Sequence, residues 1–185
     1  MSAAAASEIL VVAATERELA PVEGARTALC GIGPVEAAVA TARALAEERP
    51  AAVVHVGIAG GRGIPPLTLV LGSEALYCDA GGPLVPARAL PDAQLLARLR
   101  AAFPEAFVRP VGTSARVGGA HGVDVEAMEG FAVLRACELA GVAAVEVRVV
   151  SNEIDEPDRS LWRFDDAFAA LAEALPKLVA VASAP

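Results

Sequence analysis

Residues 27–61, TALCGIGPVEAAVATARALAEERPAAVVHVGIAGG, decide the fold class of this chain. A short apolar segment ends in a turn at residues 31–33, and a helix-like pattern then runs from Pro34 to a stop at Pro50. Small and branched apolar side chains recur along one stripe of that helix, which indicates packing against a core. Residues 53–56 follow as a buried strand. The order strand, helix, strand is typical of an α/β fold.

The remaining segments extend the same pattern in both directions. Continuous apolar runs predict buried strands over residues 9–14 and 145–150. Further elements are a helix over 95–103, a strand over 107–112, a nearly all-apolar helix over 126–139, and a last helix over 165–175 disturbed by Pro176. Residues 62–91 are rich in Gly and Pro and predict irregular strands and loops. With no linker and no internal repeat, we expect residues 1–185 to form a single domain, with residues 1–7 flexible.

The composition excludes several classes of partner. Hydrophobic residues make up 55% of the chain and charged residues 21%, which is enough for a sizeable core. The 15 Lys and Arg residues stand against 23 Asp and Glu residues, so the net charge is −8. A chain this acidic lacks the basic face that nucleic acids require. No apolar stretch of transmembrane length is free of charges or breakers, so we expect no membrane span.

The cysteines indicate a reducing compartment. Cys30, Cys78 and Cys137 lie far apart, and their odd number and spacing argue against a zinc site and against a disulfide framework. The start of the chain, MSAAAA, lacks the basic region and the long apolar core of a signal peptide. We therefore expect a cytoplasmic protein with free thiols.

Three polar side chains are candidates for one site. Glu18 lies one turn past the first strand, and Asn152 follows the strand over 145–150. Because ligand sites of α/β proteins form at the carboxyl ends of strands, both are expected at one edge of the sheet. Glu129 lies near the start of an apolar helix, where a buried glutamate is rare unless it is paired or functional. A solvated loop carboxylate remains an equal reading for Glu18, and a turn residue for Asn152.

The third strand ends in small residues, a pattern that favours ligand binding. The segment Gly57-Ile58-Ala59-Gly60 lets a ligand approach the backbone, although a plain turn would use the same residues. The earlier turn at residues 31–33 does not predict a dinucleotide site, because Glu36 replaces the third glycine. His55 stands among valines, which favours a core role. With two histidines in the chain, we expect neither a metal site nor a Ser-His-Asp triad.

Together these segments resemble the purine nucleoside phosphorylase and nucleosidase superfamily. The resemblance rests on five motifs in order: the first strand with Glu18, residues 30–38, the glycine segment after Val56, residues 128–130, and residues 147–152. The branch that the chain is most similar to is futalosine hydrolase. That similarity rests on residues 57–60, 126–130, 151–152 and 156–159, and on Trp162.

The resemblance implies an α/β fold with a central mixed sheet flanked by helices, and a homo-oligomer that binds a small nucleoside. It implies hydrolysis of the N-glycosidic bond of futalosine, with release of hypoxanthine in the futalosine route to menaquinone, and no cofactor. Glu18 would act as general base or position the water, Glu129 would bind the ribose hydroxyls, and Asn152 would bind the base. The substrate-binding residues expected beside them are Gly57, Ile58, Ala59, Gly60, Met128, Ser151 and Phe164.

Departures from the superfamily keep alternatives open. Methylthioadenosine/S-adenosylhomocysteine nucleosidases carry an aspartate where Asn152 stands and a glutamate where Ala127 stands; they and aminodeoxyfutalosine hydrolase are the alternatives in this class. Phosphorylases hold phosphate with an arginine and a serine, and the matching places here are His55 and Ile58, which favours water. A catalytically silent nucleoside-binding protein is the alternative of another class, and the presence of both Glu18 and Glu129 argues against it.

The residue that stacks on the base is also open at this point. The segment over 112–126 is short and lacks the aromatic residue that the superfamily places there. Phe131, Trp162 and Phe164 are the candidate substitutes.

Overall fold

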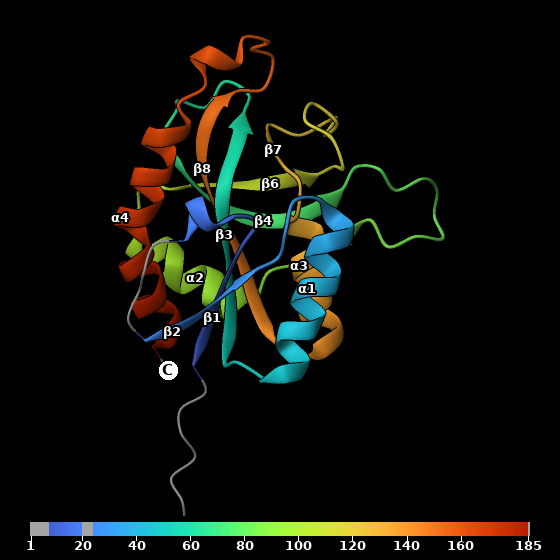
Figure 1. Ribbon diagram of the computed structural model, residues 1–185, viewed down its shortest axis with the longest axis vertical. Coiled ribbons are helices and arrows are strands. Elements are labelled where there is room, and N and C mark those ends of the chain that lie inside the picture. Colours follow the sequence, from blue (N-terminus) through green and yellow to red (C-terminus); the bar gives the residue numbers. More distant parts are fainter. Residues whose placement is uncertain (1–7, 20–23, 185) are drawn as a thin grey trace, which may run out of the picture.

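The computed structural model describes residues 8–19 and 24–184, and its helices are interspersed among strands along the chain (Figure 1). The strands are β1 (Ile9–Ala13), β2 (Ala25–Leu29), β3 (Ala52–Gly61), β4 (Leu69–Tyr77), β5 (Arg88–Ala89), β6 (Phe107–Thr113), β7 (Val125–Ala127) and β8 (Ala143–Glu153). The α-helices are α1 (Pro34–Glu47), α2 (Ala93–Ala102), α3 (Gly130–Ala140) and α4 (Phe164–Ser183), with 3₁₀ turns η1 (Glu16–Glu18) and η2 (Arg159–Leu161). The predicted flexibility of residues 1–7 lies outside the described residues.

The strands of the described residues form an eight-stranded mixed sheet. β1 pairs in parallel with β2 and with β3, and β3 pairs in parallel with β8. β8 runs antiparallel to β4, β4 parallel to β6, and β6 parallel to β7, which pairs with the end of β3. The pairing therefore returns to β3 and closes a ring of five strands. The predicted α/β class with a central mixed sheet is confirmed.

Helices cover both faces of the sheet, because successive side chains of a strand point to opposite sides. Val11 and Val54 pack with the leucines of α4 and α2 on one face. Val12 and Val53 pack with α1 and α3 on the other face. Figure 1 shows α4 and α2 on one side of β1 and β3, and α1 and α3 on the other. Burial on two sides explains why these strands are continuous apolar runs.

Two predicted helix limits are wrong. The helix predicted over 126–139 begins at Gly130, because Glu126 pairs with Gly60 and Gly112 as part of β7. The last helix is not limited by Pro176, since α4 continues to Ser183. A proline removes one helical hydrogen bond. The buried side chains on both sides of it, Leu175 among them, hold the helix against the sheet despite that loss.

The segment over 62–91 consists of strands and loops, as its composition predicts. It contains β4, a nine-residue strand that pairs with β5, β6 and β8 and whose pairing with β6 is irregular between Gly72 and Glu74. The glycine segment at 57–61 belongs to β3 rather than to a turn. Among the described residues, no helix combines the length and the apolarity needed to cross a membrane.

Candidate active site

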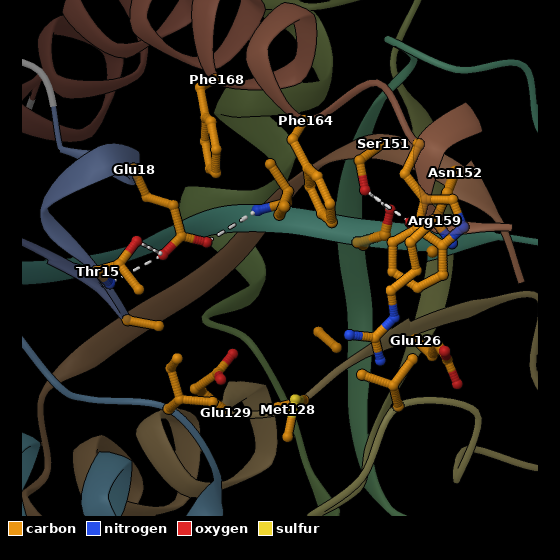
Figure 2. A pocket seen from close by; sticks show the side chains of 18 of the residues that line it. Thr15, Glu18, Glu126, Met128, Glu129, Ser151, Asn152, Arg159, Phe164 and Phe168 are labelled. Atoms are coloured by element: carbon orange, nitrogen blue, oxygen red, sulfur yellow. Dashed lines mark hydrogen bonds between the residues drawn. The ribbon is translucent and has the colours of Figure 1, made fainter.

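A cleft of about 270 Å³ lies where β1, β3 and β8 end (Figure 2). These three strands are mutually parallel, so their carboxyl ends meet at one edge of the sheet. The cleft is lined by Ala14, Thr15, Glu18, Ile32, Ile58, Ala59, Gly60, Arg116, Val117, Glu126, Ala127, Met128, Glu129, Ser151, Asn152, Arg159, Trp162, Phe164 and Phe168. The three predicted catalytic residues thus share a single cleft.

Glu18 is held in place by backbone and side-chain donors. It is the last residue of η1 and is 7% exposed. Its Oε2 accepts hydrogen bonds from the Thr15 backbone N–H at 2.9 Å and from the Thr15 hydroxyl at 3.0 Å. Its Oε1 accepts from the Ile58 N–H at 3.2 Å. These bonds fix the carboxylate at the edge of the sheet, and the reading of Glu18 as a solvated loop residue is wrong.

Glu129 is fixed by one backbone N–H and one buried cation. It is the N-cap residue of α3 and is 5% exposed. Its Oε1 accepts a hydrogen bond from the Gly33 N–H at 3.2 Å, and its Oε2 lies 3.5 Å from Nη2 of Arg148. The turn before α1 therefore anchors a carboxylate that faces the cleft.

Asn152 and Ser151 lie inside β8 rather than in a turn after it. The Ser151 hydroxyl donates to Oδ1 of Asn152 at 2.7 Å, and Nδ2 of Asn152 donates to the Glu153 carbonyl at 3.0 Å. Among the described residues, one hydrogen on Nδ2 and one lone pair on Oδ1 of the Asn152 amide remain without a hydrogen-bond partner. The amide can therefore give one hydrogen bond and accept another inside the cleft.

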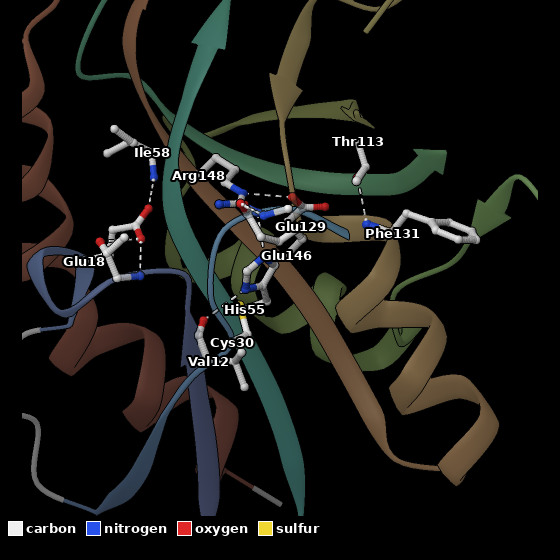
Figure 3. A network of polar contacts seen from close by, with 12 residues as sticks. Val12, Glu18, Cys30, His55, Ile58, Thr113, Glu129, Phe131, Glu146 and Arg148 are labelled. Carbon is white, nitrogen blue, oxygen red and sulfur yellow. Dashed lines mark hydrogen bonds and ion pairs between the residues drawn. The ribbon is translucent and has the colours of Figure 1, made fainter. Parts of the chain in front are cut away.

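A buried charge network behind the cleft was not predicted (Figure 3). Arg148 is fully buried, and its Nε donates to Oε1 of Glu146 at 2.8 Å. Its Nη2 lies 2.5 Å from Nε2 of His55, in addition to the contact with Glu129. A signal for this network was present in the sequence, because Glu146 and Arg148 are charged residues two apart in an apolar strand. Such charges are rarely buried unless they are paired.

Burial sets the protonation of the network. Burial lowers the pKa of His55 well below its ordinary value, and the Arg148 charge lowers it further. The neutral ring can donate from Nδ1 to the Val12 carbonyl at 3.0 Å and accept from Arg148 at Nε2. Burial also raises the pKa of Glu146, against the opposing effect of Arg148. Burial, followed by the Glu129 charge, raises the pKa of the Cys30 thiol to about 12.

Gly57 lies behind the cleft rather than in its wall. Ile58, Ala59, Gly60, Met128, Ser151 and Phe164 line the cleft as expected, whereas Gly57 does not. A Cβ atom on Gly57 would collide with Nη1 of Arg148 and would lie 2.7 Å from Oε1 of Glu18. The absence of a side chain at this position is what lets Arg148 and Glu18 approach each other.

Aromatic side chains reach the cleft from the C-terminal part of the chain. Trp162, Phe164 and Phe168 line it, with ring centroids 5.5 Å apart for the first pair and 6.5 Å for the second. Phe131 does not line the cleft, since it stacks on Tyr77 at 5.1 Å elsewhere. Sequence reasoning also missed three charged lining residues, Glu126, Arg116 and Arg159.

Comparison with known proteins supplies the family. A model of the phosphorylase superfamily matches residues 22–183. The futalosine hydrolase of Streptomyces coelicolor is 34% identical, over 82% of this chain and 77% of that protein. The futalosine hydrolase of Acidothermus cellulolyticus is 32% identical, over 70% of this chain and 68% of that protein.

Solved structures share the fold. Futalosine hydrolase of Helicobacter pylori has a TM-score of 0.84 at 15% identity, covering 95% of this chain and 98% of its own. The 5′-methylthioadenosine/S-adenosylhomocysteine nucleosidase of Neisseria meningitidis, in complex with methylthio-immucillin-A, has a TM-score of 0.79 at 24% identity, covering 92% and 97%. The superfamily match and the two curated relatives go further than the fold: this chain belongs to the phosphorylase superfamily and, within it, to the futalosine hydrolase family.

Proposed function

We propose that the protein hydrolyses the N-glycosidic bond of futalosine and releases hypoxanthine, a step of menaquinone biosynthesis. The observation that carries the proposal is that two buried carboxylates, Glu18 and Glu129, face the same cleft as the amide of Asn152. The family relationship supports futalosine as the nucleoside. The reaction needs no cofactor, because water is the nucleophile and side chains handle the proton and the charges.

Glu129 is proposed to bind the ribose. Its carboxylate would accept hydrogen bonds from the 2′- and 3′-hydroxyls. As the bond from C1′ to the base lengthens, positive charge develops on the sugar, and a fixed anion stabilises that charge. The Gly33 N–H and Arg148 support the role, since they hold this carboxylate in one orientation before the substrate arrives.

Glu18 is proposed to position the water and to accept its proton. The water oxygen would bond to C1′ while the electron pair of the C1′–N9 bond leaves with the base. General-base groups of this kind typically contribute about 10²–10⁴-fold. The three donors from Thr15 and Ile58 support the role, since they hold this carboxylate in one orientation at the edge of the cleft.

Asn152 is proposed to bind the leaving base. Its free Nδ2 hydrogen would donate to O6 of the purine, and its Oδ1 lone pair would accept from N7–H as the base departs. The second hydrogen bond strengthens only when N7 gains its proton, so it favours the transition state. A neutral amide cannot supply that proton, which therefore comes from water. Ile58, Ala59, Gly60, Met128, Ser151 and Phe164 are proposed to contact the substrate, with Gly57 acting behind them.

Water is favoured over phosphate as the nucleophile. His55 is fully buried between Val12 and Arg148 and does not reach the cleft, while Ile58 presents an apolar side chain. Arg148 is engaged by two carboxylates and by His55. Glu18 and Glu129 would also repel a phosphate anion.

The proposed reaction predicts hypoxanthine release at a rate that does not depend on phosphate. Purified protein would be incubated with futalosine, methylthioadenosine and inosine, each with and without phosphate, and the freed base identified by chromatography. We expect futalosine to be the preferred substrate. A requirement for phosphate, or a ribose 1-phosphate product, would contradict hydrolysis. Preferred release of adenine from methylthioadenosine would support the alternative nucleosidase, and no release from any substrate would support a silent binding protein.

We also propose that the protein is a homodimer or larger. Val35, Val39 and Leu139 are 66–72% exposed on the outer side of α1 and α3. Ile32, at the start of this apolar surface, lines the cleft. Burial of such a patch in a second copy is favourable, and contiguous apolar patches mark interfaces. The segment over 62–91, whose Leu84 is 94% exposed, is expected at the interface or at the mouth of the cleft.

Light scattering at micromolar concentration tests the assembly. We expect the mass of a dimer or a larger oligomer for the natural protein and a smaller mass for Val39→Asp. A clean monomer would contradict the proposal.

A cytoplasmic location stays a prediction from the sequence.

A further inference from the structure

Glu126 has a buried carboxylate oxygen without a hydrogen-bond partner among the described residues, and the proposed mechanism gives this side chain no role. It lines the cleft and is 8% exposed. Its Oε1 accepts a hydrogen bond from the Gly118 N–H at 2.9 Å. Its Oε2 is shielded from water and has no hydrogen-bond partner among the described residues. A buried carboxylate oxygen without a donor is unfavourable, so this atom is suited to a donor that arrives with a ligand.

The register of the sheet places Glu126 beside Asn152. Gly60 pairs with Glu126 on one side and with Asn152 on the other. A Cβ atom on Gly60 would lie 3.3 Å from Cγ of Glu126 and 3.3 Å from Nδ2 of Asn152. The two side chains therefore lie next to each other over Gly60, where a Cβ atom would crowd both. Figure 2 shows Glu126, Asn152 and Arg159 toward one end of the cleft, with Glu18 and Glu129 toward the other.

We infer that Glu126 reads N1–H of a 6-oxopurine base. The inference rests on the proposed function and names a residue that sets its base specificity. In hypoxanthine the N1–H donor lies next to the O6 acceptor, whereas in adenine the N1 acceptor lies next to the N6 donor. A carboxylate is an acceptor only, and the Asn152 amide has a free donor hydrogen. Glu126 and Asn152 together thus match two adjacent atoms of hypoxanthine and mismatch both of adenine.

The hydrogen bond from the Gly118 N–H gives Glu126 an alternative role that is purely structural. By accepting that N–H, Glu126 anchors the segment that carries Arg116 and Val117 over the cleft. Glutamine at position 126 keeps an oxygen for Gly118 but presents an NH₂ group to the base. The substitution Glu126→Gln therefore separates base recognition from anchoring. Glu153→Gln is a matched control, because Glu153 accepts the Gly63 N–H at 2.9 Å and does not line the cleft.

The test compares kcat/KM for futalosine and aminodeoxyfutalosine in the natural protein and both variants. For Glu126→Gln we expect the preference for futalosine to fall by roughly 5- to 150-fold, the equivalent of one buried mismatched hydrogen bond. For Glu153→Gln we expect no change in that ratio. An equal loss on both substrates would assign Glu126 to loop anchoring, and an unchanged ratio would remove it from base recognition; either result overturns the inference.

A binding measurement keeps this test separate from the fate of the proposed reaction. Calorimetry with free hypoxanthine, 1-methylhypoxanthine and adenine needs no turnover. We expect the natural protein to prefer hypoxanthine to its 1-methyl form, and Glu126→Gln to lose that preference with an unchanged midpoint of thermal unfolding. If the natural protein binds hypoxanthine in this way but leaves futalosine intact, the proposed reaction fails while the inference stands. Equal binding of hypoxanthine and 1-methylhypoxanthine by the natural protein would overturn the inference.

Discussion

Glu18→Gln is expected to lower kcat for hydrolysis by about 10²–10⁴-fold, because an amide cannot take the proton of the attacking water. Glutamine can still accept the Ile58 N–H through its oxygen, so binding of the substrate should survive. The measurement is kcat and KM with futalosine, together with calorimetric binding of hypoxanthine. A loss confined to kcat marks an interaction made in the transition state.

Glu16→Gln is the matched control for this experiment. Glu16 belongs to the same 3₁₀ turn, is exposed and does not line the cleft. Its substitution should leave both constants unchanged. Near-normal turnover of Glu18→Gln would remove Glu18 from the proposed mechanism.

Arg148→Met is expected to lower the free energy of unfolding by about 3–5 kcal/mol, because it leaves a buried carboxylate without its cation. Glu146 is fully buried and its Oε2 has no hydrogen-bond partner among the described residues, so it depends on Arg148. Urea unfolding measures the loss. Arg109→Met, in which an exposed arginine of β6 is replaced, should have little effect. Adding Glu146→Gln to Arg148→Met removes the unpaired charge and should restore part of the stability; a full-sized loss in the double variant would contradict this explanation.

The same variant should show a characteristic dependence on pH. Burial raises the pKa of Glu146, and removal of the Arg148 charge would raise it further. A carboxyl group with a raised folded pKa binds more protons when folded, so its contribution to stability falls as the pH rises. His55 acts in the same direction. Burial and then the Arg148 charge lower its pKa, and the effect of Arg148, which favours the unfolded state of the natural protein in acid, is lost in the variant. The stability difference between the natural protein and Arg148→Met should therefore be larger at pH 8 than at pH 5.

The sequence predicts those elements whose pattern of apolar residues is contained within the element itself. The apolar runs of β1 and β8 and the stripe of α1 each carry their own periodicity, and all three lie where the sequence places them. β7 falls at the start of a predicted helix, because this strand is defined by distant partners. Gly60 and Gly112 pair with Glu126, and no residue close in sequence reports those pairings.

The residues of the candidate site also fall into two groups, those that the sequence predicts and those that it does not. Glu18, Glu129 and Asn152 stand at the ends of recognisable elements, so the sequence alone was enough to predict that they meet in one cleft. Arg148 was missed because the strand pattern was read only for its apolar residues. Glu126 was missed because a helical reading placed it away from Gly60, and only the sheet register brings it beside Asn152.

The cleft combines distant parts of the chain, and this has a consequence for folding kinetics. Its walls come from residues 14–18 at one end of the chain, from β3 and β7 in the middle, and from residues 151–168 near the other end. Beside this cleft, Arg17 forms an ion pair with Asp165, which lies 148 positions away in the sequence. Contacts between such distant residues close large loops and form slowly. Recovery of turnover after dilution from denaturant should therefore lag behind recovery of helical circular dichroism, which makes enzyme activity a reporter of the last step of refolding.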